Sequence, residues 1–389
     1  MAKTRVALEI TEAGVRAIEV TAGRHPVILT AGEVPLPEGA AKDSEILDRD
    51  AVAMALQRLW ADARISSREV VLGVGNRRIL VREHSTHLTN PDHIRQALPF
   101  EVQDRLPVPV DQAVLDFVPT RQDEAGVHGL LVAAVAEHME ELVEALTQAK
   151  LRPVSVDLTA FGHSRALAAL CAPGETGLFL GIGEHTTHIV IATDGVPSFV
   201  RVVPIDIVPS ENVDADDAPS APHTGEERGD AMPTAAPALH PSVAASPGAG
   251  SATTRRARRV AAGTVAVLDR PEDVHTSASI EPTTRDLPPA DLRLHPDVQA
   301  ALIDLVGRLR GTVAFYRDRP DAVPIDRTFI AGAHASHGRL LEAVGRVTET
   351  PVTAVTATDL LGPPRGFTLP ADVGSRLAAT AALLIGDAR

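Results

Sequence analysis

Two stretches of the chain alternate short apolar runs with small polar turns. The first covers residues 6–34, VALEITEAGVRAIEVTAGRHPVILTAGEV, and the second covers residues 178–201, LFLGIGEHTTHIVIATDGVPSFVR. In both, β-branched runs of a strand's length are separated by turns that contain Gly, Asp or Thr, a pattern typical of antiparallel strands. Each stretch is therefore predicted to form a meander of three strands.

The two stretches also repeat each other at an offset of about 172 residues. At this offset Leu8 falls on Leu180 and Gly23 on Gly195. We interpret the chain as two related halves, although two unrelated meanders would give a similar pattern. Polar loops that face each other could close on a triphosphate through backbone N–H groups and hydroxyls. This organisation resembles that of the actin-like and sugar-kinase-like ATPases.

Further segments are predicted from the spacing of apolar residues and from prolines. A helix at 50–63 and strands at 69–74 and 79–83 continue the first half. A helix that begins at Pro91 should stop before the Leu-Pro-Val-Pro step at 106–109. The predicted segments are a first-half core at 1–88, an inserted α/β subdomain at 89–150 with strands at 114–118 and 129–136 and a helix at 137–150, a return to the first half and start of the second half at 151–208, an insert at 209–292, and the remainder of the second half at 293–389.

The insert at 209–292 is rich in Pro, Ala, Ser, Thr, Asp and Gly. Because such a composition buries too little apolar surface to offset chain entropy, the insert is predicted to be disordered. Periodic segments then return, and the predictions are a helix at 296–316, a strand at 328–333, a helix at 337–347, a short strand at 352–355 and a final helix at 372–385.

Composition narrows the classes of function. The 389 residues carry a formal net charge of −14, so no basic field is available to attract nucleic acid. The single cysteine, Cys171, cannot form an internal disulfide, which fits a reducing compartment. No run approaches the length of a membrane span or of a signal-peptide core. A cytoplasmic protein is expected, with membrane contact only through a partner.

Several motifs resemble those of the PilM family of type IV pilus assembly proteins. They include the Leu-Pro-Val-Pro step followed by VDQAVLDF at 110–117, and LRPVSVDLTAFGHSRALA at 151–168. The resemblance covers roughly residues 4–206 and 294–386. It implies an actin-like (ribonuclease H-like) α/β fold of two halves, with a small subdomain inserted in the first half and a long disordered insert in the second.

The resemblance also implies a function and a partner. Such a protein is a scaffold at the inner face of the cell membrane that holds the N-terminal cytoplasmic tail of a single-pass, PilN-like inner-membrane protein. Pilus motor ATPases are a further candidate partner. The tail is expected in a groove between the first-half core and the inserted subdomain, lined by Arg77, Arg78, Leu80, Arg82, Ile94, Leu98 and Phe100.

The candidate nucleotide site departs from the pattern that the resemblance implies. The family's first loop reads Asp-x-Gly-Ser-Ser, whereas this chain has Glu9 at the acidic position and places Glu12 where a phosphate should lie. Gly181 stands where the second loop should carry an acid, and no cationic side chain is expected nearby. The candidate residues of this degenerate site are Glu9, Thr11, Glu12, Gly181, Gly183, Thr186, Thr187, Gly332 and Ala333.

We therefore expect no catalytic residue, no cofactor and no metal site, because the histidines do not have the spacing of metal ligands. One alternative is an active ATPase that binds ATP and Mg²⁺ with Glu9 as its only metal-associated carboxylate. Another is a cell-division protein similar to FtsA. That alternative is less favoured, because the sequence ends without a basic amphipathic helix.

Overall fold

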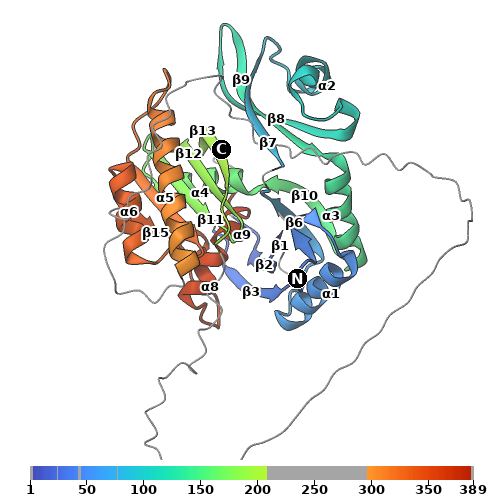
Figure 1. The fold of residues 1–389 in the computed structure, drawn as a ribbon. Helices are drawn as coiled ribbons and strands as arrows, with labels where there is room; N and C mark the ends of the chain where they lie inside the picture. The colour runs from blue at the N-terminus through green and yellow to red at the C-terminus, as the bar shows by residue number, and fades with distance from the viewer. Residues whose placement is uncertain (1–2, 24, 43–44, 77, 208–295, 387–389) are drawn as a thin grey trace, which may run out of the picture. The chain divides into compact units, whose positions relative to one another are not determined.

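A computed structural model describes residues 3–23, 25–42, 45–76, 78–207 and 296–386 (Figure 1). The insert predicted at 209–292 lies outside the described residues, and so does Arg77. The described part is an α/β fold built on two five-stranded sheets and one smaller three-stranded sheet.

The first sheet has the strand order β10-β6-β1-β2-β3. Its strands are β1 (Thr4–Ile10), β2 (Gly14–Thr21), β3 (Ile28–Pro35), β6 (Glu69–Val74) and β10 (Arg152–Leu158). The first three are antiparallel, which confirms the first predicted meander, while β6 runs parallel to β1 and to β10. A short ribbon of β4 (Ala41–Lys42) and β5 (Glu45–Ile46) follows the meander.

The second sheet has the order β13-β12-β11-β14-β15. Its strands are β11 (Thr176–Ile182), β12 (Thr186–Thr193), β13 (Val196–Pro204), β14 (Arg327–Gly332) and β15 (Val352–Ala354). Here β11 pairs antiparallel with β12 and parallel with β14, as β1 pairs with β2 and β6. The two sheets therefore share one topology, which confirms the interpretation as two related halves.

Helices cover both faces of each sheet (Figure 1). They are α1 (Arg49–Asp62), α3 (Ala136–Gln148), α4 (Thr159–Leu170), α5 (Pro296–Arg317), α6 (Gly338–Thr348), α7 (Ala357–Leu361), α8 (Ala371–Arg376) and α9 (Ala378–Ala382). On the first sheet, α1 and α3 pack on one face and α7 and α9 on the other; α5 and α6 pack on the second sheet. Helix α4 contacts both the second sheet and α9, so it lies between the two halves. The single final helix predicted at 372–385 is instead the pair α8 and α9, and α7 was not predicted.

The inserted subdomain is a three-stranded antiparallel sheet of order β7-β9-β8 with one helix packed on it. Its elements are β7 (Leu80–Thr86), α2 (Pro91–Val102), η1 (Gln103–Arg105), η2 (Val110–Gln112), β8 (Ala113–Asp123) and β9 (Gly126–Val135). Its extent differs from the predicted 89–150. Strand β7 belongs to it because all seven of its residues pair with β9, while α3 belongs to the first-half core because Leu142 and Leu146 are buried there.

Local sequence explains how the subdomain helix begins and ends. Asn90 caps α2 by accepting a hydrogen bond from the backbone N–H of Asp92 at 2.9 Å, and Pro91 occupies the first turn. The helix ends before the Leu-Pro-Val-Pro step, as predicted. The subdomain also touches the second half, since Arg319, just after α5, forms an ion pair with Glu83 of β7. The subdomain is thus fixed at its root and also tied to the opposite half.

Candidate functional site

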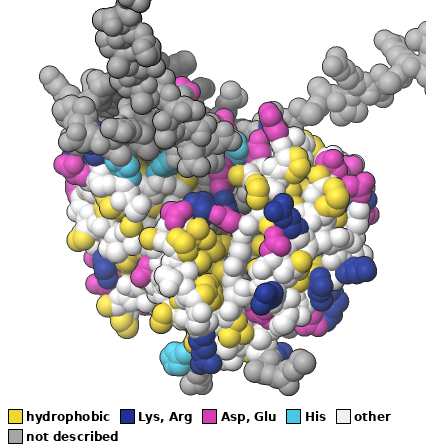
Figure 2. All heavy atoms as spheres, turned by 90° about the horizontal axis from the view of Figure 1, so that it is seen from below, with side chains coloured by type: hydrophobic (Ala, Val, Ile, Leu, Met, Phe, Trp, Pro, Cys, Tyr) yellow, Lys and Arg dark blue, Asp and Glu magenta, His cyan; other side chains and the backbone are white. Residues whose placement is uncertain are grey.

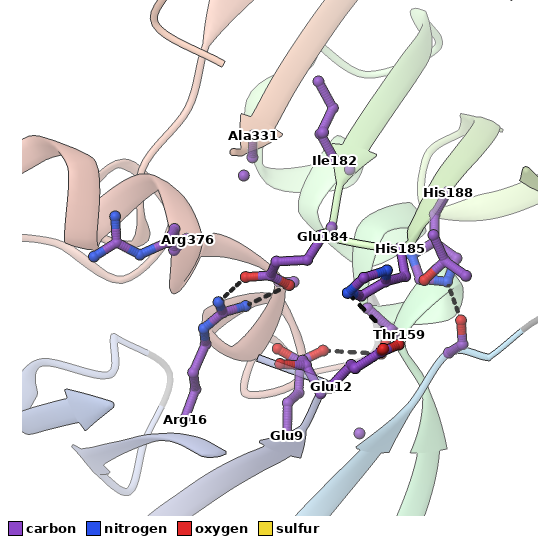
Figure 3. Close-up of a pocket in the computed structure, with 18 of the residues that line it drawn as sticks. Glu9, Glu12, Arg16, Thr159, Ile182, Glu184, His185, His188, Ala331 and Arg376 are labelled. Atoms are coloured by element: carbon purple, nitrogen blue, oxygen red, sulfur yellow. Dashed lines mark hydrogen bonds and ion pairs between the residues drawn. The ribbon is translucent and has the colours of Figure 1, made fainter. Parts of the chain in front are cut away.

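A cavity of about 80 Å³ lies where strand ends from the two large sheets meet (Figure 3). Strands β1, β6, β11 and β14 contribute their carboxyl ends, and helices α4, α8 and α9 close it. Its lining residues are Glu9, Ile10, Thr11, Glu12, Arg16, Gly73, Gly75, Thr159, His163, Gly181, Ile182, Gly183, Glu184, His185, Thr186, His188, Ala331, Gly332, Arg376 and Ala379. The repeat therefore brings the two predicted loops together.

The retained carboxylate, Glu9, lies in the first sheet and points into this cavity (Figure 3). Its oxygens accept hydrogen bonds from the hydroxyls of Thr159 at 3.1 Å and Thr380 at 2.6 Å. Burial raises the pKa of Glu9, and the two hydroxyls and the nearby Arg16 only partly offset that effect. Each carboxylate oxygen thus accepts a hydrogen bond from the chain itself.

The ring of His163, on α4, lies where a side chain at position 181 would extend. A Cβ atom built on Gly181 would overlap Cε1 of the His163 ring. The ring is fully buried and stacks on Phe179 with centroids 4.4 Å apart, and neither ring nitrogen has a hydrogen-bond partner among the described residues. Burial holds the pKa of His163 well below its usual value, so the ring is neutral. The space that an acidic side chain would need is filled.

An ion pair spans the cavity between the halves (Figure 3). Arg16 of β2 donates from both terminal nitrogens to Glu184, which follows β11, and the longer contact is 3.5 Å. Only 10% of the Arg16 side chain and 5% of the Glu184 side chain are exposed. Burial disfavours both charges, but the attraction between them favours the ionised form of each. The pKa of Arg16 is therefore raised and the pKa of Glu184 is lowered.

Two further charges extend this pair within the cavity wall. Arg16 also lies 3.4 Å from Glu33 of β3, and Arg376 of α8 donates to both oxygens of Glu33, at 3.2 and 2.5 Å. The expectation that no cationic side chain lies near the loops was therefore wrong. It failed because Arg16 sits on the strand after the loop, and only the fold turns its side chain back toward Glu184.

Glu12 lies at the cavity, as expected, but its carboxylate is turned toward a histidine. One oxygen lies 3.5 Å from Nε2 of His185, whose Nδ1 lies 2.8 Å from Asp206. A second histidine, His188, sits deeper and contacts the carbonyl oxygen of Gly75 at 2.7 Å through Nε2, and burial lowers its pKa.

Three backbone N–H groups of the predicted loops donate hydrogen bonds within the chain. The N–H of Gly183 donates to the carbonyl of Thr186 at 2.9 Å, and that of Ala333 donates to Ile182 at 3.0 Å. The N–H of Gly332 donates to the Ser375 hydroxyl at 3.2 Å. Thus these three donors already have partners within the chain.

The remaining predicted residues divide between the cavity and the core. Thr11 and Thr186 line the cavity, but the Thr11 hydroxyl donates to the Gly14 carbonyl at 3.0 Å inside its own turn. Thr187 is fully buried away from it, and Ala333 is not among the lining residues. Gly332 has φ of +101°, and a Cβ there would overlap the carbonyl oxygen of Ile182, so this position requires glycine.

Sequence reasoning missed several residues of the site: Arg16, Thr159, His163, Glu184, His188, Arg376 and Thr380. One signal was available, because the repeat aligns Glu12 with Glu184 and so marks the second glutamate as a loop residue. The other residues come from elements whose packing the sequence does not reveal. Among the described residues, no group of three or more His, Cys, Asp or Glu side chains could hold a metal ion.

The residues predicted for the partner groove fall in two places. Ile94 and Leu98 line a groove of about 210 Å³ between α2 and β8, with Leu115, Phe117 and Val127. Arg78 and Leu80 line a separate shallow depression at the root of the subdomain, with residues 106–108 and 133–135.

The other predicted groove residues line neither feature. Phe100 is 78% exposed on α2, and Arg82 lies on β7 outside both sets of lining residues. The predicted residues therefore do not line one continuous groove among the described residues, and the place of a tail stays a prediction.

The described surface is mixed in charge. On the face seen in Figure 2, acidic and basic side chains are interspersed, and neither sign forms an extended patch among the described residues there. No helix in the part of the chain that the structure describes is both long and apolar enough to cross a bilayer.

Comparison with known families places this chain. Residues 7–201, just over half of the sequence, match the family model of the type IV pilus assembly protein PilM. The chain belongs to the PilM family. The matched segment covers the first sheet, the inserted subdomain and the meander of the second sheet, so the resemblance seen in the motifs is confirmed.

Solved structures agree on the fold. A structure described as a PilM–PilN type IV pilus biogenesis complex matches with a TM-score of 0.69 and 20% identity, over 97% of this chain and 97% of that chain. At this identity the match shows the fold alone, which is the predicted actin-like fold.

Two other structures match more distantly. The cytoplasmic domain of EpsL from the type II secretion system of Vibrio cholerae has 12% identity over 52% of this chain and 71% of that chain, with a TM-score of 0.38. The ethanolamine utilisation protein EutJ from Carboxydothermus hydrogenoformans has 10% identity over 99% and 90%, with a TM-score of 0.44. Both scores are too low to carry an argument.

Proposed function

We propose that this PilM-family protein is a cytoplasmic scaffold of type IV pilus assembly with a degenerate nucleotide site. It binds the N-terminal tail of a PilN-like inner-membrane protein and reaches the membrane through that partner. Membership of the PilM family supports a role in type IV pilus assembly. The similar solved complex is described as containing PilN together with PilM. The observation that carries the proposal is that the cavity between the halves is small and that its carboxylates, Glu9 and Glu184, are bound by side chains of the chain itself.

Three features of the cavity disfavour a nucleotide. Its volume of about 80 Å³ is well below the roughly 300–1,000 Å³ of pockets that bind small molecules. A triphosphate would meet Glu9, Glu12 and Glu184, and the cation nearest to them, Arg16, is already paired. Breaking a buried ion pair by removing one partner costs about 3–5 kcal/mol, which corresponds to at least a hundredfold loss in affinity.

We place the extended tail over the root depression, whose volume is only about 10 Å³ against about 210 Å³ for the groove between α2 and β8, so the tail would lie along its surface. The depression lies between β7 and β9 on one side and the Leu-Pro-Val-Pro step on the other, so both strands and a fixed turn shape it. The prolines limit the backbone freedom of this step, which keeps the depression preformed. Leu80, Leu106 and Val108 offer aliphatic contacts, and Arg78 adds a cation at its rim, where it pairs with Glu45 at 2.7 Å.

Calorimetric titration tests both parts. ATP with Mg²⁺ should give no binding, and a dissociation constant below about 10 µM would overturn the degenerate site. A peptide of the N-terminal residues of a PilN-like protein from the same genome should bind. Val108→Glu should weaken it at least about tenfold, whereas Gln122→Glu, in the groove between α2 and β8, should leave it unchanged. The reverse result would move the tail site to that groove.

The alternative function is an active ATPase. The retained carboxylate of Glu9 and the glycine conformation at Gly332 favour it, because both belong to the phosphate-facing part of the cavity. Release of inorganic phosphate from ATP that is abolished by Glu9→Gln would establish this alternative. An expected role for motor ATPases as partners stays a prediction.

A further inference from the structure

The ion pair between Arg16 and Glu184 joins two segments that the chain separates by 168 residues. Arg16 lies on β2, in the centre of the first meander, while Glu184 lies in the loop between β11 and β12 of the second. The contact uses both terminal nitrogens of the guanidinium and both oxygens of the carboxylate. It therefore links the halves at the point where their equivalent loops face each other (Figure 3).

The guanidinium of Arg16 is also held by contacts that do not involve Glu184. Glu33 contacts Nε of Arg16 from the neighbouring strand, and Arg376 binds Glu33 from the opposite side. Arg376 in turn lies 3.3 Å from Asp372 on its own helix. Because the arginine is already ordered by the first half and α8, docking of Glu184 loses little further side-chain entropy. Preordering of this kind lowers the cost of forming a buried ion pair, whose attraction otherwise competes with a large desolvation penalty.

The halves thus meet around a cavity of only about 80 Å³. Other contacts across the cavity include the 3.5 Å approach of Glu12 to His185 and the hydrogen bond from His188 to the carbonyl of Gly75. We propose that Arg16, Glu33, Glu184 and Arg376 form a cleft clasp, a charge network that holds the two halves closed in place of a bound nucleotide. This inference rests on the proposed degenerate site and adds how the closed form is maintained.

If the clasp holds the two halves together, the distance between them should depend on the charge and the length of the side chain at position 184. Glu184→Gln keeps the shape and removes the charge, and Glu184→Asp keeps the charge but shortens the side chain by one methylene. Both should open the cleft. Glu69→Gln is the matched control, since Glu69 forms an exposed ion pair with Arg152 within the first half only.

The experiment measures the distance between halves by double electron–electron resonance on the full chain. Spin labels are placed at Met54→Cys on α1 and Ala314→Cys on α5, both exposed, in a Cys171→Ala background. Without nucleotide, the parent and the control should give one narrow distribution. The two Glu184 variants should give a broader distribution that extends to longer distances.

Hydrogen exchange gives a second readout that does not need labels. Amides of residues 183–186 should lose protection at least about tenfold in the Glu184 variants and remain unchanged in the control. An unchanged distance distribution together with unchanged protection in folded Glu184→Gln would overturn the clasp. Tight ATP binding by the parent would instead overturn the degenerate site, so the two failures are distinguishable.

Discussion

Removing the two ends of the Arg16–Glu184 pair should have unequal effects on stability. Arg16 contacts two carboxylates, Glu184 and Glu33, and lies close to a third, Glu9. Arg16→Gln leaves Glu184 buried without its cation, while Glu33 keeps only Arg376. Leaving a buried charge unpaired costs about 3–5 kcal/mol of unfolding free energy.

The opposite change is milder for a structural reason. In Glu184→Gln, Arg16 keeps Glu33 as a partner, and the new amide oxygen can still accept a hydrogen bond. Only the charge-assisted part of one contact is lost, about 1–2 kcal/mol. Both variants should therefore lower the free energy of unfolding, and Arg16→Gln should lower it by about 2 kcal/mol more than Glu184→Gln.

Urea denaturation at pH 7, followed by circular dichroism, measures both variants against the parent. Arg152→Gln is the control, because it breaks an exposed ion pair that should contribute no more than about 1 kcal/mol. Equal costs for Arg16→Gln and Glu184→Gln would refute the reasoning, since they would mean that the acids around Arg16 do not depend on it.

Three other predictions follow from buried or restricted groups. His163 and His188 have lowered pKa values, so below pH 6.5 the unfolded chain binds more protons than the folded chain, and the free energy of unfolding should fall from pH 7 to 5.5 by up to about 1.4 kcal/mol per pH unit for each histidine. The raised pKa of Glu9 has the opposite effect. Thermal melts at several pH values should show that His163→Phe reduces the pH dependence of stability by one proton. Gly332→Ala should destabilise by at least about 2 kcal/mol, whereas Gly307→Ala, at an open helical site, should stabilise slightly; equal urea midpoints would contradict this. Replacing Pro107 and Pro109 by Ala should weaken binding of the PilN-like tail more than it lowers the melting temperature, and affinity within about threefold of the parent would exclude the root depression.

Much of the fold could be predicted from the sequence because its signals are local. The alternation in residues 6–34 and 178–201 fixes the strands of both meanders, and the repeat at Leu8 and Leu180 indicates their shared topology. The role of β7 could not be predicted in this way. Its pairing with β9 joins residues more than forty positions apart, and nothing in its own pattern distinguishes the subdomain sheet from the core sheet.

The part of the candidate site formed by the ends of β1 and β11 and the loop after β1 could be predicted from the sequence. Glu9, Glu12 and Gly181 stand at the expected cavity because loop position alone puts them there. Arg16, His163 and the hydroxyl of Thr380 come from three other elements, and their approach depends on the crossing of α4 and α9 between the sheets. Long-range packing of this kind leaves no trace in the spacing of one sequence.

The packing of His163 over Gly181 bears on how such a protein could change over generations. An aspartate at 181 would collide with the ring, and overpacking of this kind costs about 1–3 kcal/mol. A smaller side chain at 163 would leave a void beside Phe179, which also lowers stability. Each step taken first is harmful, and only both together would make room for an acid. An acid at position 181 would therefore require both changes together, because packing opposes each of the two single changes.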